Sequence, residues 1–132
     1  MSIEPSSYIL RIPRDELQRH LYIKRSFYVG IKRDWSKGTR VLFVRKDEFC
    51  SLGVIDRFVE RDVIGDEREK KLCLENNWYG KIVFSKLVRF QPAVPIHDTP
   101  VTDQNPISLD GATISSPYVI HIQMLARVKI IL

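Results

Sequence analysis

The sequence predicts an α+β fold, in which a curved antiparallel sheet of five to six strands is flanked by an early helix and a C-terminal helix. Three observations support this prediction. The length of 132 residues suits one domain spanning 1–132. Apolar and β-branched segments follow one another through the chain with tight turns between them, which favours antiparallel strands. Five or six short strands in a domain of this size tend to close into a barrel.

A strand and a helix come first. Residues 8–12 are rich in strand-forming side chains and stop at Pro13. Proline suits the first turn of a helix because its missing N–H is not needed there, and the acidic Asp15 is favoured by the helix dipole. Apolar side chains then recur at helical spacing, so we expect a helix over residues 14–22.

The middle of the chain reads as three successive strands joined by turns. Residues 26–31 are aromatic and β-branched, which favours a strand. Gly38 is available for a turn, and the apolar residues 39–45 form the next strand. Residues 49–62 predict a long strand, and Gly53 within it indicates a bulge or a close approach of the backbone.

The second half alternates between charged, extended and helical patterns. The charged residues 65–71 predict an exposed loop, whereas the alternation over residues 79–90 predicts a half-buried strand. Residues 91–117 hold five of the seven prolines and are expected to be extended. Ser and Pro at 115–117 suit the start of a helix, and helical spacing continues to Val128.

Composition excludes several classes of protein. With 44% hydrophobic and 28% charged residues, wholesale disorder is excluded. No apolar run approaches the roughly 20 residues of a membrane span, and the first residues lack the pattern of a secretory signal. Cys50 and Cys73 form no CxxC pair and are expected to be buried thiols. These features predict a cytoplasmic protein.

The last residues, from Lys129 to Leu132, form an apolar run without a polar tail. Such an end suggests that the domain is the N-terminal part of a longer protein. A terminal apolar segment that docks on the barrel would explain it as well.

The net charge of +5 comes from the first part of the chain. Residues 1–49 contain 11 Lys and Arg against 6 Asp and Glu, whereas residues 50–132 contain 10 of each. A basic segment fits a polyanion, since Lys and Arg contact phosphates. A merely solvent-exposed face explains the same charge equally well.

No motif of a catalytic or metal centre is found in the sequence. The six glycines are scattered singly, so none forms a phosphate-binding loop. His20, His97 and His121 lie far apart and without metal-ligand spacing. The pair His97 and Asp98 is better explained as loop surface than as an acid–base pair. We therefore expect neither an enzyme nor a cofactor.

Aromatic side chains accompany the basic region and return later in the chain. Tyr28 and Trp35 lie among its Lys and Arg residues, and Trp78 begins the later strand. Positive charge follows a nucleic-acid backbone and aromatic faces stack on bases, so this mixture fits nucleic acid with an exposed or flipped base. Both tryptophans lie where a strand meets a loop, where binding residues concentrate. A tryptophan there can also plug the mouth of a barrel.

Four short motifs occur in a recognisable order, namely SKGTRVLF at 36–43, FCSLGVI at 49–55, NWYGKI at 77–82 and PVTD at 100–103. The first resembles a segment leading into the central strand of EVE-type proteins, and the others resemble motifs of YTH domains. Both belong to the PUA-like superfamily, small pseudo-barrels that read nucleic acids. The resemblance spans roughly residues 7–128 and implies a PUA-like pseudo-barrel.

The resemblance also implies a base-binding site. YTH domains hold a methylated adenine in a cage of aromatic side chains, and here Tyr28 and Trp78 match two of its walls. The segment that supplies the third wall, 61–75 in this chain, has no aromatic residue. Either Trp35 or Phe27 supplies that wall, or the cage is open.

A polar residue after the first strand reads the base edge in these relatives, and Asp15 is the nearest match. An ionised carboxylate there accepts a hydrogen bond from an exocyclic amine but donates none. The alignment also allows Arg14 or Gln18.

Our first hypothesis is a non-catalytic domain that recognises a modified, flipped base, such as methylated adenine or cytosine, in DNA. Similar PUA-like modules are N-terminal recognition domains of McrBC-type modification-dependent restriction systems, which implies a downstream AAA+ GTPase domain and a nuclease partner. The predicted base-binding residues are Tyr28, Trp35, Trp78, Asp15 and Phe27, and the predicted phosphate contacts are Arg25, Lys32, Arg33, Lys37 and Lys81.

Two alternatives remain open. One is a reader of the YTH or EVE type that recognises modified RNA and binds it through base stacking and phosphate contacts. The other is a barrel that binds a small molecule or a protein, with a basic half that is only solvent-exposed.

Overall fold

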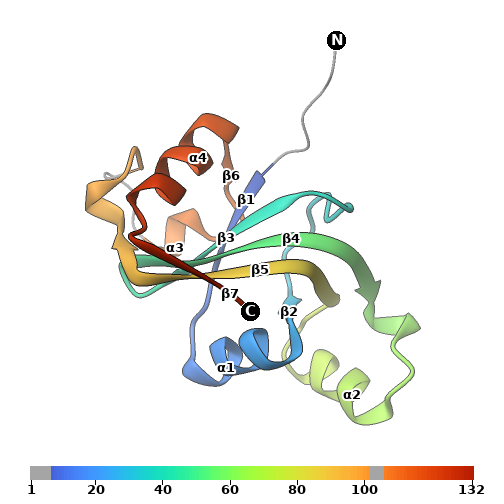
Figure 1. Ribbon diagram of the computed structural model, residues 1–132. Helices are drawn as coiled ribbons and strands as arrows, with labels where there is room; N and C mark the ends of the chain where they lie inside the picture. Colours follow the sequence, from blue (N-terminus) through green and yellow to red (C-terminus); the bar gives the residue numbers. More distant parts are fainter. Residues whose placement is uncertain (1–6, 102–105) are drawn as a thin grey trace.

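A mixed sheet of seven strands organises the computed structural model, which describes residues 7–101 and 106–132 (Figure 1). The strands are β1 (Ser7–Arg11), β2 (Ser26–Val29), β3 (Arg40–Arg45), β4 (Glu48–Glu60), β5 (Gly80–Pro95), β6 (Thr113–Ile114) and β7 (Val128–Ile131). The helices are α1 (Asp15–Lys24), α2 (Glu67–Glu75), α3 (Pro106–Leu109) and α4 (Ser116–Leu125), and short 3-10 turns occupy Arg61–Val63 and Ile96–Asp98. The predicted α+β class is confirmed.

The strand order is β2-β5-β4-β3-β1-β6, with β7 paired to β5 beside this path. The expectation of an antiparallel sheet of five to six strands was wrong. The sheet has seven strands, and it is mixed because β1 runs parallel to β3, after the chain has passed through α1 and β2. The expected closure into a barrel is not found in the described residues, where β2 and β6 end the path unpaired with each other. With only two residues, β6 offers too short a ladder to close the sheet.

The helix expected over residues 14–22 is confirmed as α1, and the five strands expected before residue 91 are confirmed as β1 to β5. Strand β5 runs on to Pro95, farther than the sequence predicts, and residues 102–105 of the expected extended stretch lie outside the described residues. At Gly53 the predicted close approach is found, since an added Cβ would lie 2.5 Å from the Phe84 ring. The β4–β5 pairing shifts register between Phe49 and Ser51, between Val54 and Ile55, and between Ile55 and Arg57, so no shift falls at Gly53 itself.

Two further expectations were wrong. The charged stretch 65–71, expected as a loop, contains the start of α2. Asp66 caps this helix by accepting a hydrogen bond from the Glu69 N–H at 3.0 Å, which is the capping pattern of an acidic residue followed three positions later by Glu. The final helix ends at Leu125 rather than Val128, and the following residues form β7 against β5.

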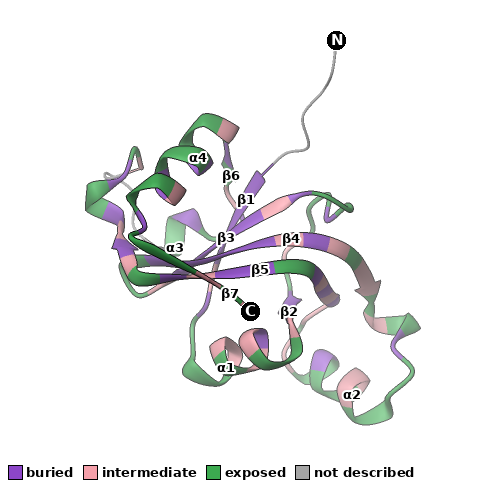
Figure 2. Ribbon diagram, in the orientation of Figure 1, coloured by how far each residue is buried: buried purple, intermediate pink, exposed green. Residues whose placement is uncertain are grey.

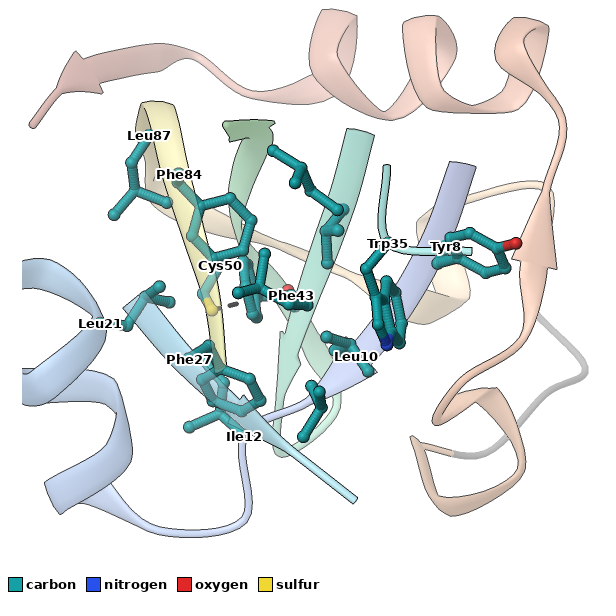
Figure 3. Close-up of a cluster of buried hydrophobic side chains, with 14 residues drawn as sticks. Tyr8, Leu10, Ile12, Leu21, Phe27, Trp35, Phe43, Cys50, Phe84 and Leu87 are labelled. Carbon is teal, nitrogen blue, oxygen red and sulfur yellow. Dashed lines mark hydrogen bonds between the residues drawn. The ribbon is translucent and has the colours of Figure 1, made fainter. Parts of the chain in front are cut away.

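Apolar side chains pack on both faces of the sheet. One cluster includes Leu21 of α1 and Phe43 of β3, and Figure 3 shows many of its members. The other includes Leu42 of β3 together with Val119 and Ile122 of α4. Helices α1 and α4 therefore cover opposite faces, because consecutive residues of a strand point to opposite sides.

Both cysteines are buried and unpaired, as expected. Burial raises the pKa of the Cys50 and Cys73 thiols. No helix among the described residues has the length and apolar character needed to cross a membrane.

Gly80 lies where β5 begins and packs directly on β4. A Cβ at this position would collide with the carbonyl oxygen of Val59 and with the ring of Phe58. Because the oxygen belongs to the backbone of a paired strand, it cannot turn away. We expect Gly80→Ala to lower the free energy of unfolding by about 1–3 kcal/mol, as measured by urea denaturation.

Gly65→Ala is the matched control, because nothing lies within 4 Å of the added Cβ. Its effect should stay within about 0.5 kcal/mol. Similar losses in both variants would contradict the proposed collision at Gly80.

Candidate nucleic-acid interface

A groove of about 590 Å³ opens between α1, α2 and the adjoining strands β2 and β5. Both helices lie on the same side of the molecule, with β2 between them (Figure 1). The residues that line this α1–α2 groove are His20, Lys24, Ser26, Tyr28, Arg57, Asp66, Arg68, Glu69, Leu72, Lys81 and Val83. Its lining includes polar, charged and apolar side chains, and the lysines and arginines outnumber the acidic residues.

The tight connection between α1 and β2 places the first wall of the groove. Arg25 ends α1 in the left-handed conformation, with φ of 55°, and its N–H donates to the carbonyl of Leu21. Strand β2 begins at the next residue, Ser26. His20 and Lys24, one turn apart on the same helix face, therefore reach the start of β2. The ring of His20 lies 3.0 Å, Nε2 to Oγ, from the hydroxyl of Ser26.

Glu69 is the central anionic group of the groove. Its Oε1 accepts hydrogen bonds from the hydroxyl of Tyr28 at 3.0 Å and from the ammonium group of Lys81 at 2.5 Å. The Glu69 and Lys81 side chains are 21% and 23% exposed. Burial, followed by the hydrogen bond to Glu69, raises the pKa of Tyr28, so its hydroxyl remains a donor. The second oxygen of Glu69, Oε2, is bonded to no other described residue.

The aromatic residues beside the groove pack against one another and do not form an open cage. Tyr28 and Trp78 stack with centroids 4.8 Å apart and planes 4° from parallel, and the ring centroid of His20 lies 5.1 Å from that of Tyr28, with the two planes tilted by 32°. The two predicted walls, Tyr28 and Trp78, are therefore brought together as expected. An aromatic base between them would need a separation of about 7–8 Å, so their own contact excludes the expected sandwich.

Trp35 and Phe27, the two candidates for a third wall, belong to the core. Trp35 is 5% exposed, packs edge-on against Tyr8 and donates its indole N–H to the carbonyl of Ile31 (Figure 3). Phe27, also 5% exposed, packs edge-on against Phe43. Their faces are covered by other core side chains, so neither can stack on a base in this structure.

Asp15 lies at the start of α1, whereas the groove is lined from the second half of that helix. Its carboxylate pairs with Arg45 of β3 at 2.5 Å. The hydrogen bond and charge of Arg45 lower the pKa of Asp15. The predicted base-edge residue is therefore part of a surface ion pair, and Glu69 is the carboxylate that the structure places in the groove.

The predicted phosphate contacts are dispersed. Lys81 lines the α1–α2 groove. Arg25 donates to the carbonyl of Ser85 at 2.7 Å, which makes it a structural link between α1 and β5. Lys37 is exposed in the turn before β3.

Lys32 and Arg33 line a second groove of about 420 Å³, together with Glu60, Arg61, Asp62 and Tyr79. The ammonium group of Lys32 lies 5.6 Å from the centre of the Tyr79 ring. Arg33 donates to the carbonyls of Gly111 and Lys32, so its guanidinium is partly engaged. This second groove is lined by both basic and acidic side chains, and Glu69 is not among its lining residues.

The sequence analysis did not identify the residues that define the α1–α2 groove, above all Glu69, Arg68 and His20. A signal for the first two was present, because Asp66 and Glu69 have the spacing of a helix cap. No local pattern reveals that α2 folds back beside Tyr28, since these contacts join residues 41 positions apart. Among the described residues, no group of three or more His, Cys, Asp and Glu could hold a metal ion.

Comparison with known proteins gives no match: no family model, no curated protein and no solved structure matches this chain.

Burial lowers the pKa of His20 from its usual value, although the charge of Glu69 opposes this and Lys81 and Lys24 add to it. The unfolded chain, with a histidine pKa of about 6.5, therefore binds more protons than the folded one. The contribution of His20 to stability is full above about pH 6.5 and is lost as the pH falls through its lowered folded pKa. His20→Gln, which does not titrate, should therefore become progressively more stable relative to the wild type as the pH falls.

Urea denaturation between about pH 7.5 and pH 5.5 measures this difference. His121→Gln, at an exposed position on α4, is the matched control for replacing a histidine with glutamine. A constant difference between His20→Gln and the wild type across the range would contradict the prediction.

Proposed function

We propose that this domain is a non-catalytic nucleic-acid-binding module that receives a flipped, modified base of DNA, such as methylated adenine or cytosine, in the α1–α2 groove. The observation that carries the proposal is the carboxylate of Glu69, half-buried and held by Tyr28 and Lys81. Amines of bases donate to carboxylates, as in the pairing of Asp or Glu with the cytosine N4 amine. Oε2 of Glu69, which accepts no hydrogen bond from the described residues, is available to accept one from the amine of a base.

The charge around the groove supports a polyanionic ligand. Lys24 and Arg68 line it from two different helices and are both exposed. Asp66 is engaged in capping α2, and Glu69 is paired with Lys81, so the acidic groups are held by the protein itself. Lys24 and Arg68 would contact phosphates on either side of the bound base, since phosphate contacts position a nucleic acid while base contacts specify it.

The size of the groove also fits this use. A volume of about 590 Å³ is within the range of about 300–1,000 Å³ found for small-ligand sites. A base in a duplex reaches such a groove only by flipping, at a cost of a few kcal/mol that pocket contacts repay. His20 lines the groove beside Tyr28, so its ring would replace the expected sandwich as the stacking partner of the base.

The resemblance to PUA-like nucleic-acid readers supports the same proposal and favours the setting of a modification-dependent restriction system. An RNA reader is the alternative, and competition between DNA and RNA oligonucleotides of the same sequence separates the two.

Lys24→Ala and Arg68→Ala test the phosphate contacts. If each cation neutralises one phosphate, each variant should reduce the slope of log affinity against log salt by about 1. The measurement is fluorescence anisotropy with labelled methylated and plain oligonucleotides over a series of salt concentrations.

Lys37→Ala is the matched control, because it removes the same charge from the exposed turn before β3. It should leave the salt slope unchanged. Equal slopes in all three variants, or no salt-dependent binding by the wild type, would refute binding of a polyanion in this groove.

Glu69→Gln tests the base contact itself. The amide keeps the size of the side chain but loses the charge-assisted acceptor, so discrimination between adenine or cytosine and thymine at the flipped position should fall by about 1–3 kcal/mol. Discrimination is the readout because loss of a negative charge strengthens phosphate binding for every base alike.

Glu67→Gln, exposed in the first turn of the same helix, is the matched control and should alter affinity without altering discrimination. If Glu69→Gln shifts the affinity for all bases equally, Glu69 only ties α2 to β2 and β5.

A further inference from the structure

A third groove, of about 480 Å³, lies on the face of the sheet that α4 covers. The residues that line this α4-side groove are Arg40, Leu52, Val54, Lys86, Val88, Gln123, Lys129 and Ile131. Leu52 and Val88 belong to the apolar cluster beneath α4, on the face opposite to α1. The α4-side groove shares no lining residue with the α1–α2 groove, so the two grooves are separate.

Strand pairing builds its floor from two rows of side chains. One row consists of Leu52, Val88 and Ile131, which are direct partners across β4, β5 and β7. The other consists of Arg40, Val54 and Lys86, partners across β3, β4 and β5. Partners across a sheet lie about 5 Å apart, so the first row makes a continuous apolar ridge about 10 Å long.

The charged side chains that line the α4-side groove are all basic. Arg40 and Lys86 lie in the row on one side of the apolar ridge, and Lys129, opposite Phe90, lies on the other. No acidic side chain lines the groove, in contrast to the α1–α2 groove with its Asp66 and Glu69. Lys86 and Lys129 are exposed, whereas Arg40 donates to the hydroxyl of Ser116 at 2.8 Å.

Uncovered apolar surface continues beyond the groove. Ile131, Met124 and Val128 are 76%, 77% and 53% exposed, and α4 carries no Asp, Glu, Lys or Arg along its length. Figure 2 shows exposed positions along most of α4 and β7. Among the described strands, β7 pairs only with β5, so its other edge is free to accept an additional strand. Such a combination of apolar surface and free edge marks a protein-interaction site.

We propose that the α4-side groove docks an acidic peptide segment of a partner protein, with apolar side chains placed between its carboxylates. The apolar ridge accepts the apolar side chains, and the cations on either side pair with the carboxylates. A nucleic acid would use the cations alone, because phosphates gain nothing from an apolar floor. The proposal is independent of the function proposed for the α1–α2 groove.

The probe is a labelled twelve-residue peptide of alternating Asp and Leu, measured by fluorescence anisotropy against the whole domain. Two peptides of equal length, one of alternating Lys and Leu and one of alternating Asp and Ser, remove the charge match and the apolar side chains in turn. The first peptide should bind at least about tenfold more tightly than either of the others, since both contacts contribute. Equal binding of the three peptides, or no binding of the first, would overturn the proposal.

Variants locate the binding. Lys86→Glu combined with Lys129→Glu should weaken the Asp–Leu peptide by about tenfold or more, because repulsion replaces attraction. Ile131→Ser, at a side chain 76% exposed, should weaken it without unfolding the domain, as circular dichroism would verify. The matched control is Lys37→Glu combined with Lys46→Glu, which makes the same change of net charge at two exposed turn positions.

An equal loss in the control pair would show attraction to net charge alone and would overturn the assignment to this groove. If the Lys86 and Lys129 variants weaken oligonucleotide binding and leave peptide binding intact, the groove belongs to a nucleic-acid interface and the peptide proposal fails.

Discussion

The long pairing of β4 with β5 is the constraint on which the other elements depend. These strands run for 13 and 16 residues, and β3 pairs with one while β2 and β7 pair with the other. At the far end of the ladder Glu60 faces Gly80, and α2 is inserted between these two residues. The same ladder therefore places Lys81 beside α2 at one end and Val88 beside β7 toward the other.

The two grooves present different chemistry. In the α1–α2 groove a carboxylate is held by a phenol and an ammonium group, and exposed cations line the same groove. In the α4-side groove an apolar ridge is flanked by cations, and no acidic side chain lines it. A carboxylate held in place can select a hydrogen-bond donor, whereas apolar surface beside uncompensated cations favours an acidic, apolar partner.

Individual residues show how much of the candidate site could be predicted from the sequence. The proximity of Tyr28 and Trp78 was anticipated, but their stacking on each other was not, because ring separation depends on where α2 places the backbone of Asn77 and Trp78. Trp35 has the same flanking pattern as an exposed tryptophan, and only its contact with Tyr8 shows that it fills the core. Helix α2 could have been predicted from Asp66 and Glu69, whereas the partners of Glu69 could not.

Strands β1 to β5, helix α1, the α+β class and the excess of basic charge can be predicted from local patterns, because periodicity and composition are local properties of a chain. Long-range packing sets which aromatic rings are covered, which carboxylate faces a groove and where the last residues pair. The hydroxyl of Tyr28 reaches Glu69 across 41 residues, and Ile131 pairs with Val88. Such contacts arise from packing between distant segments, and no short stretch of sequence contains the information that specifies them.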